Sequence, residues 1–241
     1  MDEILKLKEI INKSKYIVVF SGAGLSTNSG IPDFRSADGL YNQKLNYKVK
    51  PEEIISHSFF LTYPEDFYSF YFDKMIYPNA KPNCAHLYFK ELEKTKKVTI
   101  VTQNIDGLHQ SAGSSDVIEL HGNVNRNYCM RCHKFYSLNE IYKKGVPHCK
   151  CGGIIKPDVV LYEEGLNEEN IDKAIEAISS CDTMIIAGTS LTVYPAASFI
   201  RYFKGKNLVL LNKSKTQADN MATISIHDDI CKVITELKKE L

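Results

Sequence analysis

The sequence of 241 residues lacks the features that mark several special classes of protein. It has no run of about 18 apolar residues, the length that a membrane-spanning helix needs. Its first residues show neither a basic stretch followed by an apolar one nor a cleavage site, so they do not predict a secretion signal. Internal repeats and low-complexity tracts are also absent. We therefore expect a soluble cytoplasmic protein with no attachment to a membrane.

The chain also has almost no net charge, because 30 Lys and Arg stand against 29 Asp and Glu and leave +1. This argues against a uniformly charged binder of nucleic acid or anionic lipid. The charge is unevenly distributed, however. Residues 124–157 carry seven basic side chains and Glu140 as their only acid, or +6, which leaves about −5 for the rest. Any basic surface must therefore be local.

Hydrophobic residues make up 44% of the chain and charged residues 24%, which is typical of a globular protein with a packed core. Short β-branched runs predict buried strands at 16–20, 98–102, 159–162, 183–187, 208–211 and 223–226. Helical patterns lie among them at 168–180, 195–204 and 228–239. Because strands and helices alternate, we expect an α/β fold with a parallel sheet. Two stretches break the alternation, one rich in aromatic residues at 31–82 and one rich in cysteine at 124–157.

The seven cysteines are an odd number, which does not suit a simple disulfide framework. Four of them form two close pairs in the basic stretch, with sixteen residues between the pairs: Cys129, Cys132, Cys149 and Cys151. Four thiolates at such spacing can surround Zn2+ and leave no position for a substrate, so we predict one structural zinc ion. Two alternatives stay open, namely reduced cysteines without metal and replacement of one ligand by His133 or His148.

The other three cysteines, Cys84, Cys181 and Cys231, are isolated in the sequence. Free cysteine is among the most buried residue types and packs like a small hydrophobic residue. Disulfides are rare in a reducing cytoplasm. We therefore interpret these three as packing residues.

A glycine turn, Gly22-Ala23-Gly24, follows the predicted strand at 16–20. The backbone N–H groups of such a turn can bind a pyrophosphate. The dehydrogenase pattern would place a third glycine at Thr27, and it is missing, so the turn alone is equally compatible with a simple strand-to-helix connection. Just beyond it, Phe34 could shield a reactive centre from water and Arg35 could bind phosphate.

Polar residues follow several other predicted strands at their carboxyl ends, where ligands of open α/β sheets bind. They are Gln103-Asn104-Ile105-Asp106 after 98–102, Gly188-Thr189-Ser190 after 183–187, and Asn212-Lys213 after 208–211. His121 follows another apolar run, and taken alone it is compatible with a structural role or with a general base. Together these residues predict one extended cofactor cleft.

Several motifs closely resemble those of the sirtuin family of NAD-dependent protein deacylases, of the bacterial type. They are GAGLSTNSGIPDFRS, TQNIDGLH, ELHG, the split cysteine pairs and GTSL. The likeness covers nearly the whole chain. It implies a Rossmann-like part formed by about 1–30, 83–123 and 158–241, with a helical insertion at 31–82 and a zinc-binding insertion at 124–157. The insertions would form a smaller domain, and the active site would lie between the two.

The resemblance also implies that NAD is a co-substrate that the reaction consumes. The residues that it assigns to NAD binding are Ala23, Gly24, Thr27, Phe34, Arg35, Gln103, Ile105, Asp106, His121, Gly188, Thr189, Ser190, Asn212, Lys213 and Ile230. The expected catalytic residues are Asn104 and His121, with His121 as general base on the ribose hydroxyls. The acyl group would pass to ADP-ribose, releasing nicotinamide, free lysine and O-acyl-ADP-ribose.

By the same resemblance, the acylated lysine of a protein would bind as an extended strand between 159–162 and the segment around 191–194. Val160, Leu161 and Tyr162 are the expected contacts. The chain reads Leu-Tyr-Glu-Glu at 161–164, where many relatives carry Phe-Phe-Gly-Glu. We expect neutral acyl groups, acetyl first, because Lys74, three residues after Tyr71, lacks the bidentate fork of the Arg in the desuccinylase branch.

Two other functions stay possible from the residues. A NAD glycohydrolase or mono-ADP-ribosyltransferase would use the same pocket without an acylated substrate. The basic cysteine-rich stretch is also compatible with a nucleic-acid-associated scaffold, although the deacylase reading does not require nucleic acid. No spare apolar seam is evident, so we expect a monomer.

Overall fold

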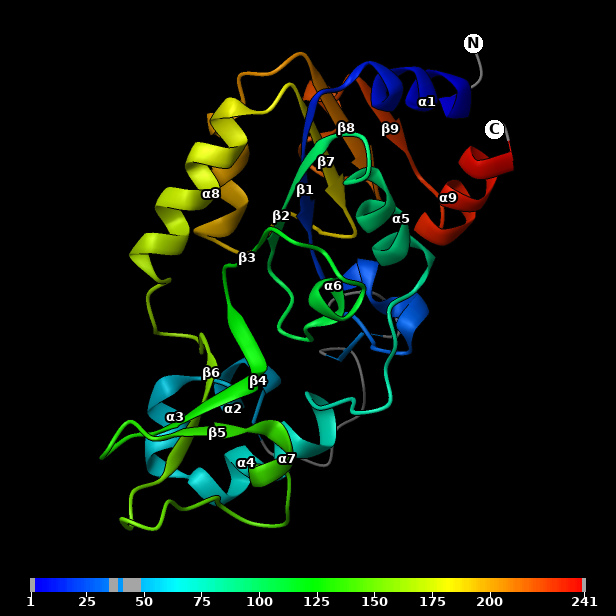
Figure 1. Ribbon diagram of the computed structural model, residues 1–241. Coiled ribbons are helices and arrows are strands. Elements are labelled where there is room, and N and C mark those ends of the chain that lie inside the picture. The colour runs from blue at the N-terminus through cyan, green and yellow to red at the C-terminus, as the bar shows by residue number, and fades with distance from the viewer. Residues whose placement is uncertain (1–2, 35–38, 41–48, 240–241) are drawn as a thin grey trace.

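The computed structural model describes residues 3–34, 39–40 and 49–239. The chain forms a larger part around a six-stranded sheet and a smaller part below it in Figure 1. Neighbouring strands of the larger sheet are all parallel, in the order β3-β2-β1-β7-β8-β9. Their bounds are β1 Tyr16–Ser21, β2 Lys97–Thr102, β3 Val117–Glu119, β7 Thr183–Ala187, β8 Asn207–Leu211 and β9 Ile224–Ile226. The predicted α/β fold with a parallel sheet is confirmed.

Helices cover both faces of this sheet (Figure 1). One face carries α8 (Glu168–Ser180) and the 3-10 helix η4 (Ala196–Tyr202); the other carries α1 (Glu3–Lys13), α5 (Cys84–Leu92) and α9 (Ile230–Lys239). The predicted helix at 195–204 is thus a 3-10 helix. Short helices in the connections are η1 (Ala23–Leu25), η2 (Thr27–Ser29), α6 (Leu108–Ser111) and η5 (Asp219–Met221).

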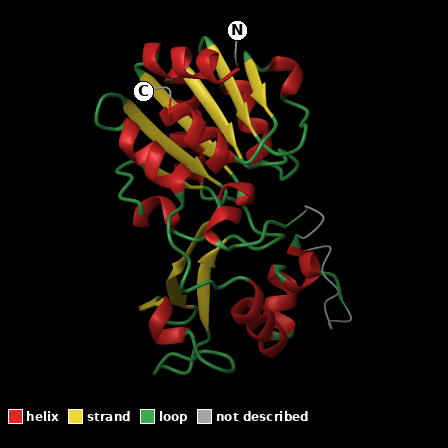
Figure 2. Ribbon diagram, turned by 90° about the vertical axis from the view of Figure 1, so that its right-hand side faces the viewer, coloured by secondary structure: helices red, strands yellow, loops and turns green. Residues whose placement is uncertain are grey.

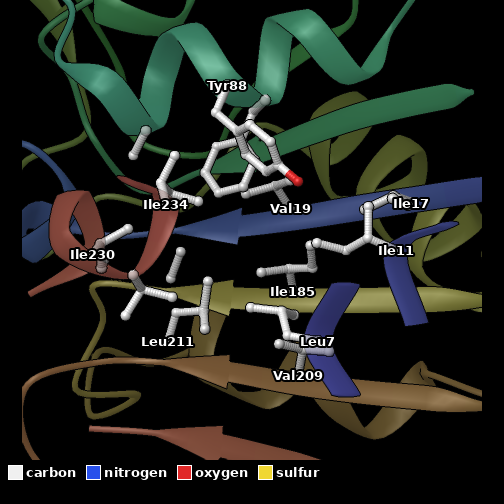
Figure 3. Packing of buried hydrophobic residues seen from close by; sticks show 14 of the residues in the cluster. Leu7, Ile11, Ile17, Val19, Tyr88, Ile185, Val209, Leu211, Ile230 and Ile234 are labelled. Carbon is white, nitrogen blue, oxygen red and sulfur yellow. The ribbon is translucent and has the colours of Figure 1, made fainter. Parts of the chain in front are cut away.

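The strands are apolar throughout because helices bury them on both sides. Successive side chains of β1 point to opposite faces, so Ile17 and Val19 join one core while Val18 and Phe20 join the other. Figure 3 shows the first of these cores, in which α1, α5 and α9 lay apolar side chains over β1, β7 and β8.

The smaller part combines helices with a three-stranded antiparallel sheet (Figure 2). The helices are α2 (Pro51–Ile54), α3 (His57–Thr62), α4 (Pro64–Lys74) and α7 (Leu138–Ile141), and the strands are β4 (Gly122–Cys129), β5 (Phe135–Ser137) and β6 (Ile155–Val159). Phe60, Phe67 and Tyr71 pack against Val124 and Val159 of this sheet. The two inserted stretches therefore share one core, as a smaller zinc-binding and helical domain requires.

The prediction of a buried strand at 159–162 was wrong. Val159 is the last residue of β6, which pairs antiparallel with β4 in the smaller sheet rather than in the large parallel one. Beyond it, Tyr162 makes only an isolated parallel bridge with Ser56. Residues 160–162 resemble a core strand in sequence because they include apolar residues. One of these, Leu161, is buried, but in the core of the smaller part.

Cys84 and Cys231 are packing residues, as predicted, but the expectation that they are isolated was wrong. They form a disulfide that joins residues 147 apart in sequence, with their Cα atoms 5.7 Å apart. Both also pack at the edge of a core cluster. Cys181 is a buried free cysteine, as expected, and burial raises the pKa of its thiol to about 12.

Within the described ranges, no helix has both the length and the apolar character needed to cross a membrane.

Candidate functional site

The glycine turn lies against the carboxyl end of β7, where three backbone segments meet. Gly22 N–H donates to Ala187 O at 3.0 Å and Gly24 N–H donates to Gly188 O at 2.8 Å. A Cβ on Gly22 would lie 2.6 Å from Thr189 Cβ, and one on Gly24 would lie 2.9 Å from Gly188 O. Only glycine allows this approach, so the turn lies directly against the backbone that follows β7 at the carboxyl end of the sheet.

Asn104, Ser26 and Asp106 form a hydrogen-bonded chain beside this turn. Asn104 Nδ2 donates to Gly22 O at 3.1 Å and to Ser26 Oγ at 3.2 Å, and Ser26 Oγ donates to Asp106 Oδ2 at 2.7 Å. Burial raises the pKa of Asp106, although the hydrogen bonds from Ser26 and from Leu108 N–H oppose the shift. The chain fixes the orientation of Asn104 and Asp106 after β2. Ser26 was not among the predicted site residues, since its only signal in the sequence is its place inside the glycine-turn motif.

His121 lies in the connection between β3 of the larger sheet and β4 of the smaller one, at the junction of the two parts. Its Nδ1 is 2.9 Å from Gln103 O. A carbonyl can only accept, so Nδ1 carries the proton and the lone pair is on Nε2. Burial lowers the pKa of His121, and the bond to Gln103 O only partly opposes this, so the imidazole is neutral near pH 7. A neutral imidazole with a free Nε2 lone pair is a general base.

Thr189 connects β2 to the loop after β7. Gln103 Nε2 donates to Thr189 Oγ1 at 3.1 Å, and the same hydroxyl accepts from Leu191 N–H at 3.2 Å. Thr189 is buried, whereas Ser190 is exposed and pairs with Thr192 through their hydroxyls at 2.8 Å. The loop therefore presents Ser190 to solvent on a backbone that Thr189 orients.

At the far end of the site, Asp229 connects the loop after β8 to the glycine-turn segment. It accepts from Asn28 Nδ2 at 2.9 Å and pairs with Lys213 Nζ at 3.1 Å. Asn212 Nδ2 donates to Ser214 O at 2.8 Å, and Ile230 is buried at the start of α9. Thr27 Oγ1 donates back to Gly24 O at 3.0 Å and so tightens the turn itself.

Residues 160–162 run between His121 and the α2–α3 connection. Val160 N–H donates to His121 O at 2.9 Å, Tyr162 N–H donates to Ile55 O at 3.1 Å, and Tyr162 O accepts from His57 N–H at 3.0 Å. The Leu161 side chain is buried in the core, and its backbone N–H donates to the Glu164 carboxylate. Tyr162 is partly exposed.

Two glutamates fix the turn that follows this segment. The Glu164 carboxylate accepts from Leu161 N–H at 2.8 Å and lies 2.6 Å from His57 Nδ1 and 3.1 Å from Lys156 Nζ. Burial alone would raise the pKa of Glu164, but these partners lower it. Glu163 has φ 76°, and its carboxylate accepts from Ser58 N–H and Ser58 Oγ, both at 2.9 Å. It thus occupies the left-handed conformation, which glycine adopts more readily than glutamate.

Of the residues predicted for the site, all but one lie in the described parts of the chain; Arg35 falls outside them. Those after β1 and β2 are joined by direct hydrogen bonds, and Gln103 extends the network to Thr189 and His121. Phe34 packs at the edge of a separate cluster with Leu40 and Ile54.

The sequence from residue 22 to residue 195, more than half of the chain, matches the model of the Sir2 family. The chain belongs to the Sir2 family. Among curated sirtuins, it is 62% identical to the NAD-dependent protein deacetylase of Clostridium perfringens over 97% of each chain, and 56% identical to that of Clostridium tetani over 100% of this chain and 99% of the relative.

Solved sirtuin structures have the same fold. A Sir2 structure with a p53 peptide and NAD+ aligns with a TM-score of 0.84 at 38% identity, covering 98% of this chain and 97% of that one. One from work on the mechanism and regulation of Sir2 enzymes aligns with a TM-score of 0.89 at 40% identity, covering 99% and 97%.

The cysteine cluster of this sirtuin has the arrangement of a four-thiolate metal site. The four sulfurs lie within 4.8 Å of one another, and Cys129–Cys151, Cys132–Cys151 and Cys132–Cys149 are 3.4, 3.5 and 3.6 Å apart. Sulfurs around Zn2+ with bonds of about 2.3 Å would be about 3.8 Å apart. The donors therefore fit a structural zinc ion despite the shortened second pair. Among the described residues, neither His133 nor His148 belongs to this cluster.

Backbone and hydroxyl donors support the thiolates of this cluster. Arg131 N–H donates to Cys129 Sγ at 3.4 Å. Cys149 Sγ accepts from Cys151 N–H at 3.5 Å and from Tyr136 OH at 3.1 Å. Such donors stabilise negatively charged sulfur, which is the form that binds metal.

Proposed function

We propose that the protein removes acyl groups, acetyl first, from lysine side chains of proteins in a reaction that consumes NAD. The observation that carries this proposal is His121, a neutral imidazole with a free Nε2 lone pair beside the chain of Asn104, Ser26 and Asp106. Family membership and the names of relatives up to 62% identical support it.

In the proposed reaction, the acyl oxygen attacks the ribose carbon that bears nicotinamide, and nicotinamide leaves with the electrons of the broken bond. His121 Nε2 then takes the proton of a ribose hydroxyl, whose oxygen attacks the acyl carbon. Water completes the release of free lysine and O-acyl-ADP-ribose. Gln103 and Asn104 would position the ribose, and Phe34 would keep bulk water away.

We further propose how NAD lies along the site. The pyrophosphate would lie against Ala23 and Gly24, with Thr27 and Arg35 nearby. The nicotinamide would lie at Ile105 and Asp106. The adenosine end would lie near Gly188, Thr189, Ser190, Asn212, Lys213 and Ile230. The peptide would bind as an extended strand along Val160, Leu161 and Tyr162.

The preference for a neutral acyl group rests on α4. Lys74 Nζ pairs with Asp73 at 3.0 Å, so its charge is already partly neutralised, and Tyr71 is almost completely buried in an apolar cluster. Neither residue offers the bidentate cation that a dicarboxylic acyl group requires.

Action as a monomer in the cytoplasm is also part of the proposal. A cluster of reduced thiolates suits a reducing compartment. Extended peptide binding needs no second subunit.

The test is mass spectrometry of the products formed from NAD with acetyl-, propionyl- and succinyl-lysine peptides of one sequence. We expect nicotinamide, free lysine and O-acyl-ADP-ribose in equal amounts, fastest with acetyl and slowest with succinyl. Nicotinamide release at the same rate without any peptide would instead assign a NAD glycohydrolase and overturn the proposal.

A further inference from the structure

The disulfide between Cys84 and Cys231 ties together the first turns of two helices. Cys84 is the first residue of α5 and Cys231 is the second residue of α9, and the two helices lie side by side on one face of the sheet (Figure 1). Because 147 residues separate the two cysteines in sequence, this bond constrains the chain between them.

The residues that flank this disulfide bind the nucleotide segment, which we define as residues 25–29, just beyond the glycine turn. Asn83 caps α5, and its Nδ2 donates to Leu25 O at 2.8 Å and to Ser29 Oγ at 3.0 Å. Asp229, just before α9, accepts from Asn28 Nδ2 at 2.9 Å. The nucleotide segment is therefore attached to both helix starts, and the disulfide sets the distance between these two attachments.

Small molecules can reach the disulfide from solvent. Both cysteines are only partly buried, and Cys84 borders a hollow of about 380 Å3 that Leu87, Ile234, Thr235, Lys238 and Lys239 also line. Of its two lysines, Lys238 already pairs with Glu91, and the exposed Lys239 suits a molecule that carries carboxylates. The other cysteines differ, since four lie in the metal cluster and Cys181 is buried.

We propose that Cys84 and Cys231 are a reversible thiol–disulfide pair that exchanges with low-molecular-weight disulfides and raises the affinity of the site for NAD when oxidised. A disulfide in a cytoplasmic protein is usually redox-sensing rather than permanent. The effect on NAD rests on the proposed function, whereas the exchange rests only on the proposed cytoplasmic location.

The exchange takes place in two steps. The thiolate of one cysteine attacks the small disulfide, which releases one small thiol and leaves a mixed disulfide on the protein. The thiolate of the second cysteine attacks the protein sulfur of this mixed disulfide and expels the second small thiol. Two electrons pass from the cysteines to the small disulfide, and the two cysteine protons end on the two small thiols.

Reduction would leave Asn83 and Asp229 on helices that are no longer covalently joined, although they still pack together and share the Lys238–Glu91 ion pair. The nucleotide segment would then be less ordered before NAD binds, and ordering it would weaken binding. We expect a roughly two- to fivefold higher Kd for NAD in the reduced form. The affinity for the peptide should be unchanged, because residues 160–162 are attached to other elements.

The first arm of the test measures the pair without any activity. The intact protein is equilibrated in buffers of fixed reduced-to-oxidised glutathione ratio and alkylated with iodoacetamide, and the peptides that contain Cys84 and Cys231 are quantified by mass spectrometry. We expect both cysteines to lose their label together as the ratio falls, and the zinc content to stay constant. Alkylation of both cysteines at every ratio would overturn the proposal.

The second arm measures NAD and peptide binding by calorimetry on the oxidised and reduced protein. Cys84→Ser and Cys231→Ser should each give the reduced Kd at every glutathione ratio, and the matched control Cys181→Ser should keep the response. Equal NAD affinity of the two forms would overturn the coupling. Absence of NAD binding by both forms would overturn the proposed function and the coupling with it. The alkylation result would still show whether Cys84 and Cys231 are a reversible thiol–disulfide pair.

Discussion

At the scale of single residues, one hydrogen bond determines the chemistry of His121. The Gln103 carbonyl accepts the proton of Nδ1, and this leaves Nε2 as the basic nitrogen. Burial lowers the pKa of the imidazole, so the base is unprotonated near pH 7. The residue type and its place after an apolar run were readable from the sequence. The tautomer was not, because it depends on a carbonyl eighteen residues away.

We predict that His121→Asn lowers kcat by about 100-fold or more, the usual contribution of a general base. The Asn amide can still donate to Gln103 O, but it has no basic atom in place of Nε2. Steady-state kinetics with an acetylated peptide check this, and calorimetry should show NAD binding largely retained. The matched control is His133→Asn, at an exposed left-handed position that Asn adopts readily, and it should keep full activity. Full activity of the His121 variant would contradict the role of His121 as general base.

At the scale of elements, the smaller part depends on pairings between distant segments. β4 and β6 pair across the cysteine-rich stretch, and Tyr68 of α4 donates its hydroxyl to Ile155 O of β6. Around the cysteines themselves the apolar cluster is small, with Ile141 and Ile155 as its buried aliphatic members. So little apolar surface cannot order the stretch alone, which is why a metal is needed there.

We therefore predict that a chelator removes one zinc ion per chain and makes residues 129–157 sensitive to trypsin, which would cut first at the exposed Lys134, Lys143 and Lys150. The six-stranded sheet should survive, so NAD should still bind. A colorimetric zinc assay and mass spectrometry of the fragments measure this. Cys149→Ser should behave like the chelated protein and Cys181→Ser like the native one; unchanged trypsin resistance after zinc loss would contradict a structural role.

At the scale of the whole molecule, two buried imidazoles make stability depend on pH. His86 of α5 and His109 of α6 have ring centroids 4.8 Å apart, and His109 Nε2 lies 2.9 Å from Ser21 Oγ. Burial lowers the pKa of His86 to about 4 and that of His109 to about 3. Both pKa values lie below the unfolded value of about 6.5. Their contribution to stability is therefore complete above pH 6.5 and is lost progressively as the pH falls below it.

We predict that lowering the pH from 7 to 5 reduces the free energy of unfolding by about 2 kcal/mol for each of these imidazoles, since pH 5 lies 1.5 units below the unfolded pKa. Urea unfolding at the two pH values measures the loss. The variant His109→Asn should be less stable at pH 7 but should lose less between pH 7 and pH 5. An equal loss in variant and native protein would show that His109 does not contribute.

Features that arise from local patterns could be predicted from the amino-acid sequence alone. Runs of apolar residues defined five of the six strands of the large sheet, and the spacing of helical patterns defined α8 and α9. The glycine turn, the polar residues after each strand and the paired cysteines were equally readable, because turn geometry, strand ends and ligand spacing involve residues close together in the chain.

Features that join distant segments could be found only in the folded molecule. β6 pairs with β4 because the two inserted stretches share one core, Ser26 links Asn104 to Asp106 across about eighty residues, and Cys84 meets Cys231 because α5 and α9 cover the same face of the sheet. Such contacts depend on which elements become neighbours on folding, and no local spacing in the chain records that.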